Sequence, residues 1–158
     1  MAEKVIVVGA GAAGLMAAIN ATGSNISVTL VEKNDRVARK VMITGKGRCN
    51  VTNNSDMDVH IRNIPKNGRF LYSAFSKFSS ADTMRFFEEC NVPLKTERGN
   101  RVFPVSDKAV DIVDALKNKA DKSGVEIIKG EVQEILCKNN KIFGVRLKDK
   151  REMFCDNV

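Results

Sequence analysis

The chain has 158 residues, of which 43% are hydrophobic and 28% charged, and this balance is typical of a soluble globular domain rather than of a disordered or membrane-spanning chain. A chain of this length can build one core without a disulfide or metal to stabilise it. The formal net charge of +7 is concentrated between Lys33 and Arg69, a segment with nine basic and three acidic residues. This local excess of positive charge indicates an anionic ligand or partner.

The cysteine pattern and the N-terminus exclude two further classes of protein. The four cysteines lie at least 18 residues apart without a CxxC pair, and the chain has one histidine, so we expect neither a metal site nor a disulfide framework. The apolar run from Val5 to Ala13 is too short to cross a membrane and lacks the basic flank of a signal peptide. We therefore expect a cytoplasmic protein without a membrane partner.

Residues 1–32 are predicted to form a strand, a glycine turn, a helix and a second strand. A β-branched run at 4–8 leads into Gly-Ala-Gly-Ala-Ala-Gly at 9–14, and good helix formers continue to residue 21. A second β-branched run at 27–31 ends at Glu32. GxGxxG alone is a weak signal, but a strand before it, a helix after it and an acidic residue after the second strand complete the context of a dinucleotide-binding turn.

Each residue of this motif has a physical task. Gly9 allows the tight turn, Gly11 lets the backbone approach a pyrophosphate, and Gly14 lets helix and strand pack closely. The diphosphate would lie at the helix N-terminus, where unpaired N–H groups favour an anion. Glu32 would accept hydrogen bonds from the adenosine ribose and would disfavour the 2′-phosphate of NADP. A glycine-rich turn without a ligand is the alternative.

Residues 33–69 form the basic segment, and its stretch 40–53 is predicted to be a turn-rich loop. Its glycine spacing does not match a Walker A loop. Lys40, Lys46 and Arg48, together with backbone N–H groups, could bind phosphate oxygens, and a solvated basic loop is the alternative. Cys49 is interpreted as a packed residue rather than a nucleophile. Residues 56–68 are predicted to be a connection, with His60 on the surface.

The remaining chain is predicted to alternate helices and strands. In residues 70–104 we expect an amphipathic helix from 80 or 81 to 90, with Met84 and Phe87 inward, and then a turn and a short strand. In residues 105–130 a helix capped by Ser106 should precede a strand at 125–128 that adds a parallel neighbour to the first two. The apolar stripe of this helix is predicted to consist of Val110, Val113, Leu116 and Ala120. Residues 131–158 are predicted to form a three-stranded β-meander over 132–138, 142–148 and 152–155.

Three motifs give the chain a family resemblance. They are Val5–Gly14 with Glu32-Lys33, Lys40–Asn53 with its Thr-Gly-Lys-Gly-Arg-Cys-Asn sequence, and Arg101–Ala109. On these residues the chain resembles the bacterial aminoacetone-oxidase/BaiN-type family of FAD-dependent oxidoreductases, also described as NAD(FAD)-utilizing dehydrogenases. The resemblance implies an α/β fold, namely a Rossmann-like FAD-binding domain of the glutathione-reductase-like type, in which a parallel sheet with helices is joined to a three-stranded β-meander.

The resemblance also implies the cofactor and its contacts. FAD would place its pyrophosphate on the glycine turn, its ribose on Glu32, its adenine against the backbone of Val132 and its flavin near residues 45–50. The residues implied in cofactor binding are Gly9, Gly11, Ala12, Ala13, Gly14, Glu32, Lys33, Lys40, Thr44, Gly45, Gly47, Arg48, Cys49, Asn50 and Val132. No catalytic residue can be named, and NAD(P)H could be the electron donor of the full-length protein. Because chains of this family are longer, we expect this one to be an N-terminal portion, incomplete at its C-terminus and not catalytically competent alone.

Two functions follow as hypotheses. The first is the FAD-binding portion of an oxidoreductase that acts on an unknown small molecule. The second is a nucleotide- or nucleic-acid-binding module that uses the basic segment 33–69. One tyrosine, no tryptophan and no aromatic residue among the basic residues before Phe70 argue against nucleic acid.

Overall fold

A computed structural model describes residues 2–158, and the chain divides into two compact units. The first unit comprises the residues up to Lys40 together with Leu116–Val158, and the second comprises Val41–Ala115. Two helices cross the boundaries: α2 (Arg39–Ile43) and α6 (Ala109–Lys122). In residues 2–158 no helix is long and apolar enough to cross a membrane.

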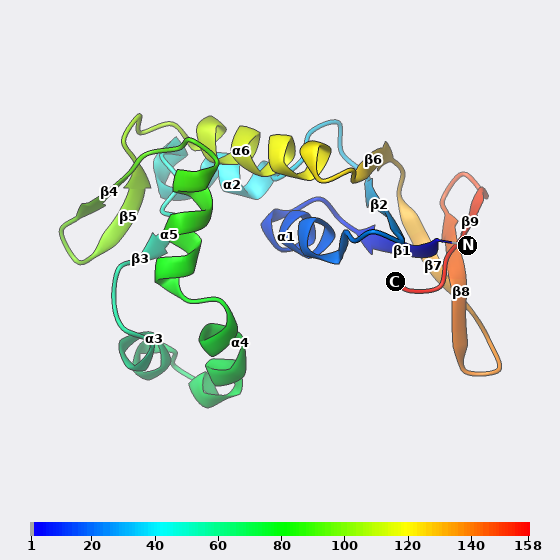
Figure 1. The fold of residues 1–158 in the computed structure, drawn as a ribbon, viewed down its shortest axis with the longest axis horizontal. Coiled ribbons are helices and arrows are strands. Elements are labelled where there is room, and N and C mark those ends of the chain that lie inside the picture. Colours follow the sequence, from blue (N-terminus) through cyan, green and yellow to red (C-terminus); the bar gives the residue numbers. More distant parts are fainter. Residues whose placement is uncertain (1) are drawn as a thin grey trace. The chain divides into compact units, whose positions relative to one another are not determined.

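The first unit is built on a parallel sheet. Strands β1 (Glu3–Val8), β2 (Ile26–Glu32) and β6 (Glu126–Lys129) pair in the order β1-β2-β6, and helix α1 (Ala12–Ala21) connects the first two (Figure 1). Helix α1 contacts β1 and β2 and buries Leu15, Ala18 and Ile19. The predicted strand–helix–strand and its parallel third strand are confirmed.

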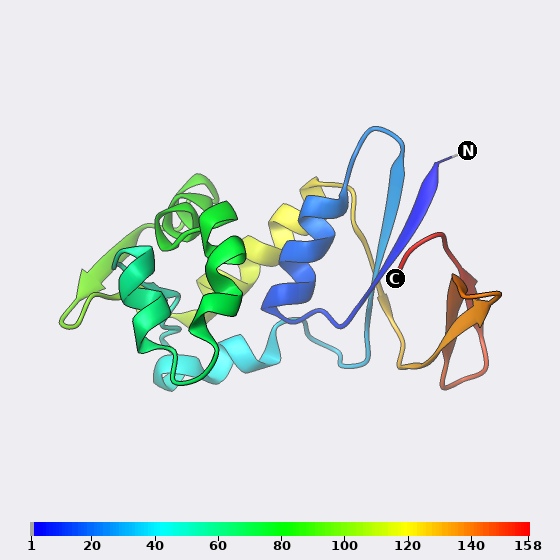
Figure 2. The same cartoon turned by 90° about the horizontal axis from the view of Figure 1, so that it is seen from below.

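A β-meander completes the first unit. It consists of β7 (Val132–Lys138), β8 (Lys141–Leu147) and β9 (Glu152–Phe154), all antiparallel, as predicted. Figure 2 shows the meander and α1 on opposite sides of the parallel sheet. The core between sheet and meander is a cluster of buried side chains: Ile6, Val31, Val145, Leu147 and Cys155. The meander therefore covers the sheet face that α1 leaves open, so that both faces of the sheet are covered, as is usual for parallel sheets.

The second unit contains an antiparallel sheet of order β3-β5-β4, formed by β3 (Thr52–Asn53), β5 (Arg101–Pro104) and β4 (Leu94–Glu97). Helix α5 (Ser80–Glu89) contacts β3 and β4 and buries Phe87, as predicted. Ser79 and Asp82 form a capping box at its start. The other helices of the unit are η1 (Thr44–Gly47), α3 (Met57–Asn63), η2 (Gly68–Leu71) and α4 (Tyr72–Lys77).

Three predictions about local structure are wrong. The stretch 40–53 is not a continuous loop, because α2, η1 and β3 occupy most of it. The predicted connection 56–68 contains α3. Helix α6 begins at Ala109, three residues after the predicted cap Ser106. Of its predicted apolar stripe, Val110 is 37% exposed, whereas Val113, Leu116 and Ala120 are buried as predicted.

Candidate dinucleotide-binding site

In the glycine turn between β1 and α1, Gly9 is required by its backbone conformation and Gly14 by close packing. Gly9 has φ 92°, a left-handed conformation that favours glycine, and its N–H donates to the carbonyl of Val31 (2.8 Å). A Cβ atom at Gly14 would lie 1.8 Å from the carbonyl oxygen of Gly9. The absence of a side chain at Gly14 thus allows the first turn of α1 to lie directly against the turn.

Gly11 is in a different environment. It has an ordinary extended backbone (φ −74°, ψ −179°) as the N-cap of α1, and a Cβ built on it meets no atom within 4 Å. No side chain caps this helix end, its first turn has no acidic residue, and Ala12 and Ala13 are exposed. The N–H groups that every helix leaves unpaired at its start therefore face an open space suited to an anion.

Glu32, at the end of β2, is bonded to the glycine turn. Its Oε2 accepts the N–H of Ala10 (2.7 Å), and its Oε1 accepts the backbone N–H (2.8 Å) and side-chain amide (2.5 Å) of Asn34. Burial by itself raises the pKa of Glu32, but the hydrogen bonds from Asn34 and Ala10 outweigh it and lower the pKa overall. The carboxylate is ionised at neutral pH. Since it has about four acceptor positions, one remains for a ligand hydroxyl.

Glu32→Gln should lower the free energy of unfolding at pH 7 by about 1–3 kcal/mol, because a neutral amide accepts these N–H groups less well. A lowered folded-state pKa contributes stability above the unfolded pKa of about 4.5 and loses it as pH falls through the folded value. Urea unfolding at pH 7 and pH 3 should therefore show a difference that shrinks in acid. Glu89→Gln, at an exposed position of α5, should behave as wild type at both pH values. A Glu32→Gln effect that is the same at both would contradict this account.

A cavity of about 480 Å³ lies beside the carboxyl ends of β2 and β6, the edge at which open parallel sheets bind ligands. Lys33, Gly130 and Glu131 contribute to its wall. Within residues 2–158 Lys33 makes no ion pair, whereas the other three cations that line the cavity pair with carboxylates: Lys129, Lys148 and Arg151. Val132, the residue after Glu131, packs its side chain against the core cluster rather than lining the cavity.

The loop after α2 has an unusual backbone. Gly45, Lys46, Gly47 and Cys49 all have positive φ, between 55° and 84°. The N–H of Arg48 donates to the carbonyl of Gly45 (3.2 Å), and that of Cys49 to the carbonyl of Thr44 (3.1 Å). Left-handed backbone is unfavourable for Lys46 and Cys49, and such strain is often found where a ligand is held.

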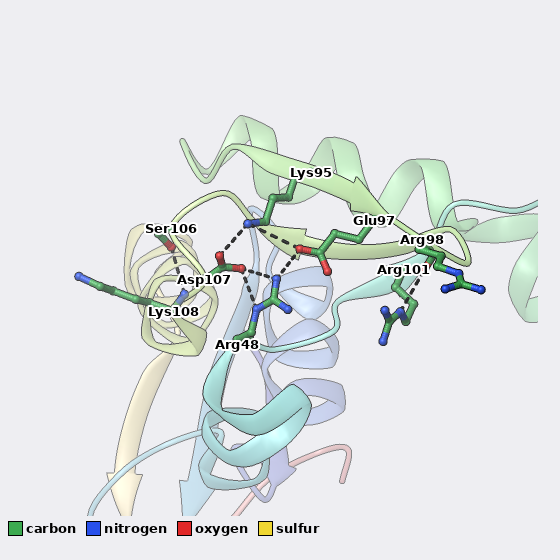
Figure 3. A network of polar contacts seen from close by, with 8 residues as sticks. All are labelled: Arg48, Lys95, Glu97, Arg98, Arg101, Ser106, Asp107 and Lys108. Carbon is green, nitrogen blue, oxygen red and sulfur yellow. Dashed lines mark hydrogen bonds and ion pairs between the residues drawn. The ribbon is translucent and has the colours of Figure 1, made fainter.

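Arg48 faces carboxylates (Figure 3). Its Nη2 donates to Glu97 (2.5 Å), and its Nε and Nη2 both donate to Asp107 (2.8 and 2.5 Å). Lys95 also donates to Asp107 (2.7 Å). The hydrogen bond from Arg48 lowers the pKa of Glu97, and those from Lys95 and then Arg48 lower the pKa of Asp107. The guanidinium also lies 4.3 Å from the ring centre of Phe103, so it connects the loop to the β4–β5 hairpin.

The other residues between 40 and 60 that the sequence analysis named differ in how far they are buried. Cys49 is buried, and burial raises the pKa of its thiol, which agrees with a packed residue rather than a nucleophile. Oriented with its nitrogen toward β5, the amide of Asn50 donates to the carbonyls of Val102 (3.2 Å) and Thr52 (2.9 Å). Lys40 and Lys46 are exposed and make no ion pair within residues 2–158. His60 is half-buried, with Nε2 3.0 Å from the carbonyl oxygen of Asn53, rather than fully on the surface.

The structure gathers the predicted site residues in two groups. The first unit contains Gly9–Gly14, Glu32, Lys33, Lys40 and Val132, and the second contains Thr44–Asn50. Sequence reasoning missed Asn34, which holds the Glu32 carboxylate, and the acidic partners of Arg48. A short polar residue two positions after Glu32 is a recognisable signal, because asparagine commonly bonds to neighbouring groups at the end of a strand.

Known proteins share both the sequence pattern and the fold. The model of the HI0933-like protein Rossmann domain matches residues 3–158. The chain is 29% identical over 152 residues to a 3-dehydro-bile acid delta(4,6)-reductase of Clostridium scindens, covering 94% of this chain and 36% of the relative. It is 30% identical over 131 residues to a ribosomal RNA dihydrouridine synthase of Haemophilus influenzae, covering 82% and 32%. The chain thus spans about a third of the length of these curated relatives.

Two solved structures have a similar fold. Thermovibrio ammonificans THI4 superposes with a TM-score of 0.61 at 16% identity, covering 93% of this chain and 47% of that one. L-proline dehydrogenase from P. horikoshii superposes with a TM-score of 0.60 at 14% identity, covering 99% and 52%.

Together the parallel sheet, the glycine turn and the acidic residue at the end of β2 define a Rossmann-type dinucleotide-binding domain. With its match over residues 3–158, the chain belongs to the HI0933-like Rossmann family, as the resemblance predicted.

Proposed function

We propose that the first unit binds FAD and that the chain is the FAD-binding portion of a flavin-dependent oxidoreductase. The observation that carries the proposal is the contrast between Gly14, whose space is filled by the Gly9 carbonyl, and Gly11, whose space is open. Packing alone explains the glycine at Gly14. A glycine at Gly11 is explained by a ligand whose diphosphate approaches the backbone there.

The surrounding residues suit the rest of the adenosine half. Glu32 is ionised, keeps an acceptor position for a ribose hydroxyl and would repel a 2′-phosphate. The cavity beside Lys33 and Glu131 has room for the adenine, and its contact with the backbone of Val132 stays a prediction from the resemblance. Ala12 and Ala13 would present N–H groups to the diphosphate. The contacts of Lys40, Thr44, Gly45, Gly47, Arg48, Cys49 and Asn50 with the flavin half stay a prediction from the resemblance.

The bound flavin supplies the redox chemistry, and this chain's residues bind and orient it. The names of the two curated relatives refer to a bile acid and to ribosomal RNA, so family membership leaves the substrate open. We therefore propose an oxidoreductase without naming its substrate or a catalytic residue, and NAD(P)H as a candidate electron donor of the whole protein.

Titrating the purified chain into FAD tests the proposal. We expect the flavin absorption bands to shift and the fluorescence to change in proportion to bound protein. NADP should not compete, because its 2′-phosphate meets the Glu32 carboxylate. Binding of NAD or ADP-ribose without binding of FAD would show that the flavin assignment is wrong.

A further inference from the structure

A basic helical surface lies in the second unit, away from the glycine turn in sequence. Residues 59–81 include no aspartate or glutamate, and they form most of α3, all of η2 and α4, and the start of α5. Helices α3, η2 and α4 contact one another. The cations they and their connections carry are Arg62, Lys66, Arg69 and Lys77. We call residues 59–78 the basic helical surface.

These four cations are not neutralised by the protein. All four side chains are exposed, and none forms an ion pair within residues 2–158. Arg62 donates through Nε to the carbonyl of Asp58 (3.1 Å), which leaves its charge unpaired. The Arg48 cluster, which pairs two cations with two carboxylates, shows the opposite arrangement. Unpaired cations on one short segment attract an anionic partner.

The same segment exposes aromatic rings. Phe70 is 85% exposed, Tyr72 53% and Phe78 41%. Two other residues of the segment are covered: Gly68 of η2 is buried, and Phe75 of α4 is half-buried, with its ring 5.6 Å from that of His60. A Cβ at Gly68 would lie 2.3 Å from the carbonyl oxygen of Ile61, so η2 packs tightly on α3. Phe70, two residues after the buried Gly68, is the most exposed ring of the segment.

Exposed rings beside unpaired cations match the chemistry of unpaired nucleotides. Aromatic rings stack on bases that are not already stacked in a duplex, and neighbouring cations bind the phosphates. Exposed amide and hydroxyl groups of Asn63, Asn67 and Ser73 can bond to the 2′-hydroxyl that distinguishes RNA from DNA. A membrane surface fits less well, since exposed Ser73 and Ser76 interrupt any continuous apolar face.

We propose that the basic helical surface binds single-stranded RNA, with Phe70 stacking on a base and Arg62, Lys66, Arg69 and Lys77 on phosphates. The proposal goes beyond FAD binding and does not rest on it, because all of its residues belong to the second unit. It also revises the expectation from sequence, which found no aromatic residue among the basic ones before Phe70. Phe70 follows Arg69 directly, and the structure leaves it uncovered.

Fluorescence anisotropy with a labelled 12-nucleotide oligouridine tests the proposal. Phe70→Ala should weaken binding by about 5- to 150-fold, the loss expected for one stacked base. The side chain is too exposed for its removal to disturb folding. Phe154→Ala removes another exposed ring, 63% accessible on β9, and should leave binding unchanged.

The cations are tested by salt dependence. Four phosphate contacts predict a slope of about −3 for log K against log salt, and Arg69→Gln should make it shallower by about 0.7. Lys138→Gln, at an exposed position of β7, should not change the slope. Repeating the titration with saturating FAD shows whether the two ligands bind independently. If the chain binds oligouridine but does not bind FAD, this proposal holds while the previous one fails.

Three results would overturn the proposal. The first is oligouridine binding that Phe70→Ala does not change. The second is equal affinity for a 12-base-pair RNA duplex or for a 12-nucleotide oligothymidine. The third is Phe70-dependent binding to phosphatidylserine-containing vesicles in place of oligouridine, which would identify a membrane surface.

Discussion

Gly14→Ala is expected to destabilise the first unit by about 3–5 kcal/mol and to lower the unfolding temperature by roughly 10 °C or more. The new Cβ would lie 1.8 Å from the Gly9 carbonyl oxygen. That oxygen belongs to a turn whose N–H is bonded to Val31, so it cannot move without disturbing the β1–β2 connection. Thermal unfolding followed by circular dichroism measures the effect.

Gly11→Ala is the matched control in the same turn. Its Cβ meets nothing within 4 Å and its φ is −74°, so the unfolding temperature should fall only slightly, by the small cost of alanine at an N-cap. Equal unfolding temperatures for Gly14→Ala and wild type would mean that α1 can shift away from the turn, and that close packing is not the reason for this glycine.

Gly11→Val is expected to weaken FAD binding by at least about 100-fold while the protein stays folded. The valine side chain would occupy the open space at the start of α1 and keep the diphosphate from the backbone. Loss of two charge-assisted hydrogen bonds at about 1.5 kcal/mol each accounts for a change of this size. Fluorescence titration with FAD, together with the unfolding temperature, separates loss of binding from loss of fold.

Ala17→Val provides the comparison for this variant, because Ala17 is an exposed position further along α1. It adds the same side chain to the same helix and should bind FAD as wild type does. If Gly11→Val also bound FAD as wild type does, the diphosphate would not lie on this turn, and the proposed site would have to be abandoned.

Local sequence patterns were sufficient for the first unit. Strands β1 and β2, helix α1 and the meander each follow from runs of β-branched or helix-forming residues separated by glycine or polar turns. Strand β6 follows from the same pattern, and its parallel pairing with β2 follows from the preceding helix. Within the site, the tight turn at Gly9 and the close packing at Gly14 agree with the prediction, because each glycine of a GxGxxG motif has a defined geometric task. The role of Gly11 toward a diphosphate stays a prediction.

The second unit could not be predicted as well, because contacts between distant residues decide its local structure. Arg48 bonds to Glu97 and Asp107, which are 49 and 59 residues away, and no pattern around Arg48 indicates either partner. Asp107 has φ 57° and directs its carboxylate to Arg48 and Lys95. That left-handed residue prevents α6 from starting at Ser106, which is why the predicted cap was wrong.

The bond from the Ala10 N–H to Glu32 joins the glycine turn to the end of the neighbouring strand before any ligand is present. The conformational entropy of ordering the turn is therefore lost when the chain folds rather than when a nucleotide arrives. Acid that protonates Glu32 would loosen the turn as well as weaken the ribose contact. Affinity for the nucleotide and rigidity of the empty site should consequently decline together, over the same pH interval.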